Sequence, residues 1–214
     1  MLDDAKARAL YEKTLLPLDK SISAFQVYLG LSVPALELGM RDYFLAVNSG
    51  YDHEDDFRRC LASDYDSCFV ELVDHSRLDP GLAPAGKGTL LIMALDNYAN
   101  WRGLSREAYS LKKEAAKQKL ISRAERYLPG LQAHIEVAEA ATPLTMQRYT
   151  GSPEGAIYGF AHSPEQSMVN RPAQETRIKV LVLAVAWTRP GAGVHSCFVS
   201  GWDAAEYAER ILGR

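Results

Sequence analysis

The sequence predicts an α+β fold in which a mixed β-sheet carries flanking helices and the chain ends in a strand, a turn and a helix. Three observations predict it. Short apolar runs bounded by Gly, Pro, Asn or Asp recur along the first 140 residues. Residues 105–128 repeat apolar positions at three- and four-residue steps. A final apolar run leads directly into a glycine-containing turn and a helix. Strands and helices do not alternate strictly, so no complete Rossmann unit is expected.

The predicted strands of the first two thirds of the chain are rich in β-branched, aromatic and other apolar residues. They cover residues 21–31, 42–47, 67–74, 89–95 and 134–137. Two helices are predicted between them. Residues 53–62 begin with acidic side chains, which suit the positive end of a helix dipole. Residues 105–128 present one apolar and one charged face, and Pro129-Gly130 ends that helix.

The last third of the chain differs from the rest in its composition and in the spacing of its apolar residues. Residues 142–160 mix Thr, Gly, Pro and aromatic side chains without a sustained period, which predicts a loop-built site. A polar connection follows over residues 163–177. Residues 178–186 form the most apolar segment and predict a buried strand, and residues 194–212 predict a helix. This change places a domain boundary between residues 141 and 142.

Composition and charge exclude several classes of protein. The chain has 214 residues, a formal net charge of -3 and no strongly basic face, so nucleic acid is not an expected partner. Cys60, Cys68 and Cys197 form no C-x-x-C pair, which predicts a reducing compartment without disulfides or a zinc site. The sequence shows neither a signal-peptide pattern nor an apolar run of about 20 residues that could span a bilayer. A cytoplasmic location is therefore expected.

The histidines and the acidic stretch are predicted to be structural. His53, His75, His134 and His162 lie in contexts typical of surface or turn-stabilising residues. His195 lies in the first turn of the last helix and could line a site, although a packing role is favoured. The acids of residues 52–56 are expected to complement a helix dipole, because a hard-cation site needs ligands spaced around a loop. No metal site is predicted.

The turn before the last helix has features that stabilise negative charge. Gly191 and Gly193 permit unusual backbone angles and close approach to the main chain. The helix that follows presents unpaired N–H groups and a positive dipole end. A tight turn that needs glycine for its shape explains the pattern equally well. As a dinucleotide fingerprint it is incomplete, because Ser196 stands where the third glycine belongs.

Two segments resemble a known family. LAVAWTRPGAGVHSCFVSGWDAAEYAERIL, residues 183–212, resembles the final segment of the phytoene desaturase, carotenoid isomerase and retinol saturase group of FAD-dependent oxidoreductases. TPLTMQRYTGSPEGAIYGF, residues 142–160, resembles that group's T-P-x-T-x-x-x-Y-T-x-x-P-x-G-x-x-Y-G pattern. With weaker similarities elsewhere, the resemblance covers nearly the whole chain.

The resemblance implies how the site is divided along the chain. In that group a dinucleotide-binding fingerprint comes first, a substrate domain follows, and the last strand, turn and helix return to contact the flavin. Residues 1–141 would then be the substrate-binding domain and residues 142–214 the FAD-facing segment. The residues expected to face the flavin and its ribityl chain are Trp187, Thr188, Gly191, Ala192, Gly193 and Val194. Tyr158 and Gly159 are expected near the ring and the substrate channel, and no catalytic residue is assigned.

Three positions depart from the group's pattern. Val185 stands where the group usually has glycine, which puts a close backbone approach in doubt. Ala192 replaces the central glycine of the turn, which is a mild change. Ala186 stands where related flavoenzymes often carry an acid that binds the ribityl chain, so one cofactor contact is missing.

The implied function is that of the carboxyl-terminal part of an FAD-dependent oxidoreductase. It would desaturate, isomerise or saturate an apolar polyene or isoprenoid substrate. The isolated chain is expected to be inactive and to bind FAD weakly or not at all, because a partner chain or a missing amino-terminal half would supply the dinucleotide-binding part. Two alternatives stay open: a non-catalytic module for a hydrophobic ligand or a protein, and a structural or dimerisation domain. A homodimer and a peripheral membrane contact for substrate access are further expectations.

Overall fold

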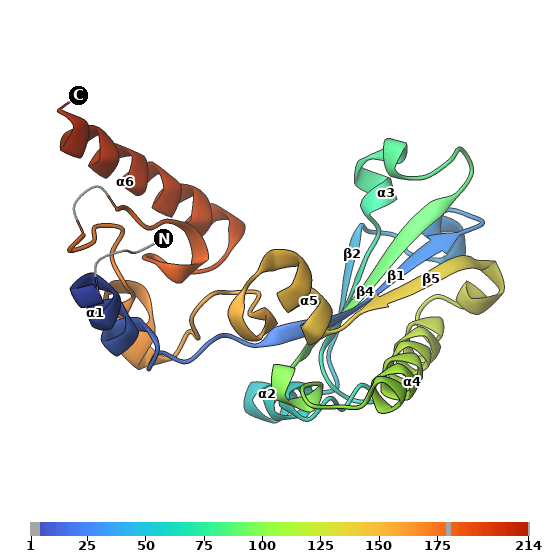
Figure 1. Cartoon of the computed structure of the whole chain (residues 1–214). Coiled ribbons are helices and arrows are strands. Elements are labelled where there is room, and N and C mark those ends of the chain that lie inside the picture. The colour runs from blue at the N-terminus through green and yellow to red at the C-terminus, as the bar shows by residue number, and fades with distance from the viewer. Residues whose placement is uncertain (1–4, 179–180, 214) are drawn as a thin grey trace. The chain divides into compact units, whose positions relative to one another are not determined.

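The computed structural model of the protein describes residues 5–178 and 181–213. The chain forms two compact units, which we call the sheet unit, Ser23–Gly155, and the terminal unit, Met1–Ile22 with Ala156–Arg214 (Figure 1). Compactness thus groups residues 142–155 with the sheet and the first residues with the last. Whether substrate and cofactor contacts divide at residue 141 is a separate matter and stays a prediction.

The sheet unit is built on a five-stranded antiparallel sheet in the order β2-β3-β4-β1-β5. Its strands are β1 Ser23–Leu31, β2 Phe44–Val47, β3 Val70–Val73, β4 Gly88–Asp96 and β5 Ile135–Ala141. All five predicted strands are confirmed, although β5 continues past the expected end at Val137. The prediction of a mixed sheet is wrong for the described residues. All four described pairings are antiparallel, including that of β2 with β3, although the connection between those two strands contains a helix.

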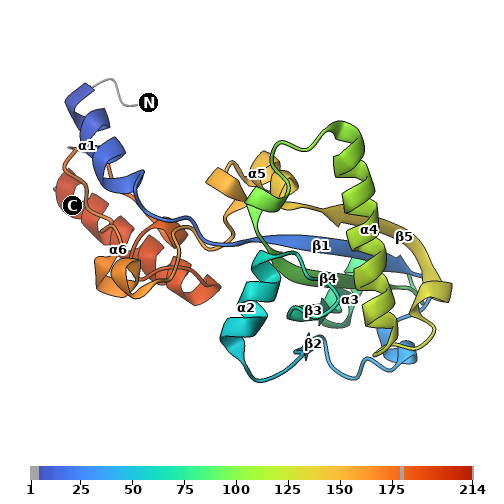
Figure 2. The ribbon, with the colours of Figure 1, turned by 90° about the horizontal axis from the view of Figure 1, so that it is seen from below.

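The helices of the sheet unit cover its two faces unequally. They are α2 His53–Leu61, α3 His75–Leu78, α4 Arg106–Glu125 and α5 Pro143–Thr150. Figure 2 shows α2 and α4 on one side of the sheet, and α3 lies on the other side. Along β4, Leu90, Ile92 and Ala94 are buried, whereas Leu91 and Met93 are half-buried. The core therefore lies on the side of α4, and the opposite face is only partly covered.

Helix α5 corrects the prediction of a loop over residues 142–160. The side chain of Thr142 accepts from the N–H of Thr145, and the side chain of Thr145 accepts from the N–H of Thr142. Pro143 occupies the first turn, where its missing N–H has no cost, and Gly151 ends the helix at φ 71°. The prediction failed because this capping box uses Thr in place of Glu, and because proline was taken for a loop residue.

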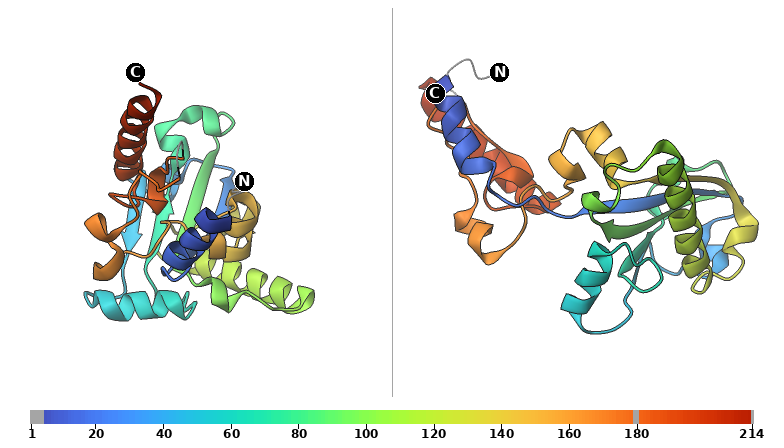
Figure 3. Two further views of the ribbon diagram at one scale, coloured as in Figure 1. Left: turned by 60° about the vertical axis from the view of Figure 1, so that its left-hand side comes forward. Right: turned by 60° about the horizontal axis from the view of Figure 1, so that its bottom comes forward.

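The terminal unit combines two helices with an irregular segment. Its helices are α1 Ala5–Leu15 and α6 Val194–Leu212, and short 3-10 turns lie at Pro164–Gln166, Met168–Asn170 and Val185–Trp187. Helix α6 has the bounds that the sequence predicts. It is the red helix at the carboxyl-terminal end of the chain in Figure 3, and Gly193 precedes it.

The predicted buried strand over residues 178–186 is wrong for the residues that are described; Lys179 and Val180 lie outside them. Val182 forms an isolated antiparallel bridge with Glu175, and Val185–Trp187 is a 3-10 turn. An apolar run becomes a strand only where a neighbouring strand pairs with it along its length. Residues 181–186 have no such neighbour in the described part of the unit and are half-buried or exposed.

Candidate functional site

An apolar groove of about 520 Å³ lies within the terminal unit. Three short segments form its walls: the turn after Ala156, the 3-10 turn Val185–Trp187 and the first turn of α6. The lining residues are Ile157, Tyr158, Val185, Ala186, Gly193, Val194, Cys197 and Phe198. Because nearly all these side chains are apolar, the groove suits a flat or extended apolar group.

The first turn of α6 brings a positive dipole end to the groove wall. Gly193 precedes the helix at φ 105°, and no side chain caps the N–H groups that follow. A Cβ at Gly193 would meet only the Ser196 Oγ, at 3.9 Å, so the approach to the backbone is open. Val194 is 78% exposed beside it. The groove therefore offers apolar walls and a place for partial negative charge at one edge.

A buried arginine holds two groove walls together. The guanidinium of Arg171, 1% exposed, donates to the carbonyl oxygens of Tyr158 at 3.0 Å and Ala186 at 3.1 Å. It also donates to the carbonyls of Phe160, Ala161 and Gln166. Burial lowers the pKa of Arg171, yet five carbonyl partners keep its charge stabilised. Sequence reasoning missed it, because a single Arg in a polar connection carries no periodic signal.

Gly159 permits the close approach of these two walls. Its φ is 70°, and a Cβ there would lie 2.4 Å from the carbonyl oxygen of Ala186. Only glycine fits both the backbone conformation and the space. The structure thus places Tyr158 in the groove wall and Gly159 directly behind it; their predicted role near a substrate channel stays a prediction.

Replacing Gly159 with alanine is expected to destabilise the terminal unit by about 3 kcal/mol, because the left-handed conformation and a backbone clash are both unfavourable. Chemical denaturation followed by circular dichroism measures the loss. The matched control is Gly213→Ala, which has the same φ of 70° but no atom within 4 Å of the new Cβ. That variant should lose about 1 kcal/mol. Equal losses in the two variants would contradict the steric argument.

Two of the six predicted cofactor residues lie behind the groove. Trp187 packs edge-on against Phe160 with ring centroids 4.9 Å apart. Thr188 is fully buried, and its hydroxyl contacts the Val185 carbonyl at 3.0 Å and the Ser200 Oγ at 2.7 Å. These residues shape the turn. Of the six, Gly193 and Val194 line the groove itself.

The other two, Gly191 and Ala192, lie against His162. The Ala192 N–H donates to His162 Nε2 at 3.2 Å, and a Cβ at Gly191 would lie 2.8 Å from His162 Cε1. Partial burial and the charge of Arg171 lower the pKa of His162, so its ring is neutral and can accept this hydrogen bond. His162 therefore has a turn-stabilising role. His195 is exposed and is not among the groove residues.

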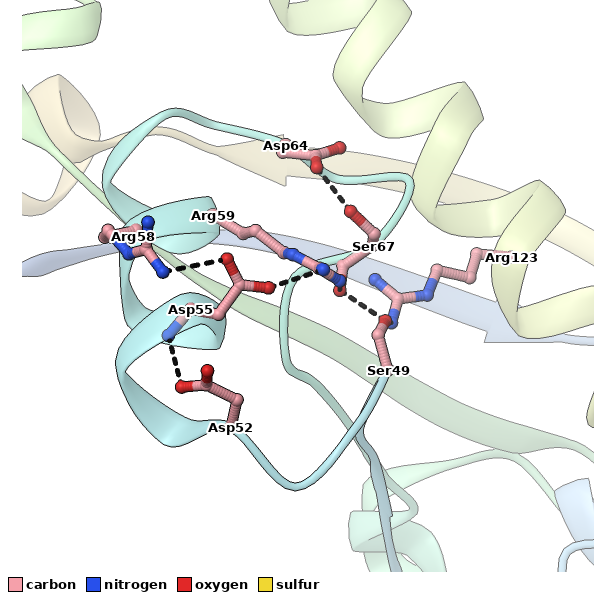
Figure 4. Close-up of polar contacts among 8 residues, drawn as sticks. All are labelled: Ser49, Asp52, Asp55, Arg58, Arg59, Asp64, Ser67 and Arg123. Carbon is pink, nitrogen blue, oxygen red and sulfur yellow. Dashed lines mark hydrogen bonds and ion pairs between the residues drawn. The ribbon is translucent and has the colours of Figure 1, made fainter.

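The acidic stretch at the start of α2 is a helix cap with local ion pairs. The Asp52 side chain accepts from the Asp55 N–H at 2.9 Å, and Asp55 pairs with Arg59 at 2.5 Å and Arg58 at 3.2 Å (Figure 4). These contacts are those expected of acids at a helix N-terminus. Figure 4 also shows Arg123, which reaches in from α4 and contacts the Ser49 hydroxyl. The arrangement is structural.

Comparison with solved structures identifies the fold class. An oxidoreductase from Methanosarcina mazei matches 96% of this chain with a TM-score of 0.51 and 13% sequence identity, and the match covers 38% of that protein. At this identity the likeness concerns the fold alone. No family model matches the chain.

Sequence comparison then identifies the relatives. Prolycopene isomerase from Daucus carota is 31% identical over 183 residues, 84% of this chain and 29% of its own length. Phytoene desaturase from Fusarium fujikuroi is 29% identical, covering 92% of this chain and 37% of its own length. A 4,4'-diaponeurosporene oxygenase from Staphylococcus haemolyticus is 26% identical over 88% of this chain and 37% of its own. The chain is a homologue of these enzymes, and its resemblance to the phytoene desaturase and carotenoid isomerase group is confirmed.

The chain spans about a third of the length of the curated relatives it matches, from 29% to 37% in the three above. The Daucus carota enzyme is described as chloroplastic. Among the described residues of this chain, no helix combines the length and the apolar character needed to cross a membrane.

Proposed function

We propose that this chain is the carboxyl-terminal part of an FAD-dependent oxidoreductase that acts on an apolar polyene or isoprenoid substrate. The observation that carries the proposal is the apolar groove with an uncapped helix N-terminus in its wall, in a homologue of carotenoid-modifying enzymes. The bound flavin would supply hydride transfer. The chain would supply position, an apolar surface and a helix dipole.

The residues of the groove fit one edge of a flavin. Val185 and Phe198 provide apolar surface, and the open backbone at Gly193 leaves the N–H groups of the first α6 turn accessible to a partly negative edge. Trp187 and Thr188 would hold the turn from behind. The adenosine and pyrophosphate need further contacts, which we assign to a dinucleotide-binding part outside this chain. The isolated chain should therefore bind FAD weakly and be inactive.

An exposed apolar stripe on α6 supports a protein partner beside the groove. Val194, Phe198 and Trp202 follow at four-residue steps and are 78%, 75% and 70% exposed. We assign this stripe to the dinucleotide-binding part, whose docking would cover it. Two other proteins could cover this stripe: a second copy of the chain, or the protein partner of a non-catalytic binding module. The flavin-uptake experiment distinguishes these hypotheses.

The test is flavin uptake by the reassembled protein. Mixed with a matching amino-terminal half that carries a dinucleotide-binding fingerprint, the chain should yield a complex that retains yellow FAD through gel filtration. The variant Val194→Asp places a carboxylate in the first turn of α6 and should weaken retention by about fivefold or more, through repulsion at the flavin edge and a charge on the docking surface.

The control is Val169→Asp, because Val169 is 72% exposed in the same unit and does not line the groove. It should retain flavin like the unmodified chain. A complex that forms without flavin would overturn the oxidoreductase proposal in favour of a binding module. Self-association that excludes the other half would favour a dimerisation domain.

A further inference from the structure

Arg123 of α4 is a buried cation that pairs with no carboxylate in the described part of the chain. It is 6% exposed. Its Nη1 donates to the Tyr65 carbonyl at 3.2 Å and lies 3.9 Å from the Cys68 sulfur. Asp64 and Asp66, in the loop before β3, bind other side chains. Because an arginine keeps its positive charge inside a protein, and a buried charge without an opposite charge is unfavourable, Arg123 is suited to bind an anion.

The other terminal nitrogen of Arg123 faces the hydroxyl group of Ser49 (Figure 4). Arg123 Nη2 and Ser49 Oγ are 3.5 Å apart, which is long for a hydrogen bond. The Ser49 hydroxyl donates to the carbonyl oxygen of Ser67, and Arg59 Nη1 lies 3.5 Å from that oxygen. Figure 4 shows that the two guanidinium groups approach this pair of serines from α2 and from α4. An anion attached to Ser49 would therefore meet positive charge.

The loop that carries Ser49 is accessible to a modifying enzyme. Residues 48–54 run from the end of β2 into the first turn of α2 and are all exposed. Acidic residues follow the serine at the third, fifth, sixth and seventh positions: Asp52, Glu54, Asp55 and Asp56. This spacing suits a serine kinase whose substrate cleft is basic. None of these acids forms an ion pair with Arg123, so its charge remains available to a phosphate.

We propose that Ser49 is a phosphorylation site and that Arg123 binds the phosphate. In this reaction the Ser49 oxygen forms a bond to the γ-phosphorus of ATP, the bond from that phosphorus to the bridging oxygen of ADP breaks, and the hydroxyl proton is released. Phosphorylation removes the hydrogen that Ser49 donates to Ser67, so the side chain is free to turn toward Arg123. A charge-assisted hydrogen bond then links the loop to α4 and stabilises the sheet unit. Neither the flavin nor the apolar substrate takes part.

The first experiment measures phosphoryl transfer to the folded full chain. The chain is incubated with magnesium ATP and casein kinase 2, a serine kinase that favours acids after the serine, and the phosphopeptide is located by mass spectrometry. The phosphate should lie on Ser49, and the peptide that contains this position should carry none in Ser49→Ala. A chain that stays without phosphate at Ser49 would overturn the proposal.

The second experiment tests whether Arg123 binds the phosphate. The second ionisation of phosphoserine has a pKa of about 6. Pairing with a guanidinium favours the dianion, so a phosphorus NMR titration of the phosphorylated chain should give a pKa about one unit lower. Arg123→Met should return that pKa to about 6. Arg58→Met is the matched control, because Arg58 is exposed and pairs with Asp55, and it should leave the lowered pKa unchanged.

Urea denaturation provides a measurement that needs no change at Arg123. The phosphorylated chain should unfold at a midpoint about 0.5 M higher than the chain without phosphate, because the phosphate gives the buried guanidinium an opposite charge. Circular dichroism checks that each variant is folded. A phosphoserine pKa of about 6 or above would overturn the role of Arg123, as would a lowered pKa that persists in Arg123→Met. A lower urea midpoint after phosphorylation would overturn it as well.

Discussion

Replacing Arg171 with methionine is expected to unfold the groove of the terminal unit while the sheet unit stays folded. The methionine keeps most of the apolar stem but leaves five buried or half-buried carbonyl acceptors without their charged donor. Since each hydrogen bond to a charged group contributes about 1.5–3 kcal/mol, the loss should exceed about 3 kcal/mol even after local relaxation. That is a large part of the stability of a small unit.

Hydrogen exchange measures this effect locally. The Ser21 N–H donates to the Gly159 carbonyl at 2.8 Å, and the Ala161 N–H donates to the Asp19 carbonyl at 2.8 Å. Both amides should exchange faster in Arg171→Met, and amides of β1 and β4 should not. Arg171→Lys should be intermediate, because an ammonium keeps the charge but lacks the planar fork of donors. Protection of Ser21 and Ala161 at the unmodified level would show that Arg171 does not hold the groove.

The strands could be predicted from the sequence better than their arrangement. Runs of β-branched, aromatic and other apolar residues identify β1 and β4. The alternation between the two faces of each strand is seen only in the burial of the folded chain. Strand order depends on contacts between residues far apart in the chain, which local patterns do not encode. The apolar run over residues 178–186 was wrongly predicted as a strand for the same reason. Its composition indicates burial, and it cannot reveal that a pairing strand is lacking.

Some residues of the candidate site could also be predicted from the sequence, and others could not. Gly193 and the helix after it could be predicted, because a glycine turn before a helix is a local pattern with a physical consequence. Arg171 and His162 could not, since their partners are backbone groups reached only after folding. The role of a residue whose side chain contacts the main chain cannot be predicted from residue types in a single sequence, because the main chain is the same at nearly every position.

Replacing Asp96 with alanine is expected to have the largest effect on the sheet unit. Asp96 ends β4, is fully buried and accepts hydrogen bonds from five donors. The donors are the Tyr65 hydroxyl, the Ser63 hydroxyl at 2.6 Å, the Asn97 N–H at 2.7 Å, the Trp101 Nε1 at 2.5 Å and the Asn100 Nδ2 at 3.1 Å. Burial and the nearby Asp96 charge raise the pKa of Tyr65, so its phenol stays protonated and donates.

The alanine variant removes the shared acceptor and takes from the buried donors of Tyr65 and Trp101 the carboxylate oxygen that accepts from both. The half-buried donors of Ser63 and Asn97 lose the same partner. A loss of about 4 kcal/mol or more is expected, because each unsatisfied buried group costs about 1–3 kcal/mol. Urea denaturation with circular dichroism measures it. Asp96→Asn should lose less, since an amide oxygen still accepts while its NH₂ group meets other donors. Asp79→Ala, at an exposed carboxylate that accepts only from the Gly81 N–H, should lose about 1 kcal/mol.

The order of stability of Asp96→Ala, Asp96→Asn and Asp79→Ala tests whether the hydrogen bonds to Asp96 stabilise the sheet unit. It is a stricter test than the stability of any one variant. If the five donors drive the effect, Asp96→Ala must be the least stable and Asp79→Ala must remain close to the unmodified chain. The stack of Phe25 on Trp101, with centroids 5.4 Å apart, should loosen with it, because the Trp101 ring is fixed at its Nε1 by Asp96. An Asp96→Ala protein with unchanged near-ultraviolet circular dichroism and a loss below about 1 kcal/mol would mean that apolar packing alone fixes this corner of the sheet.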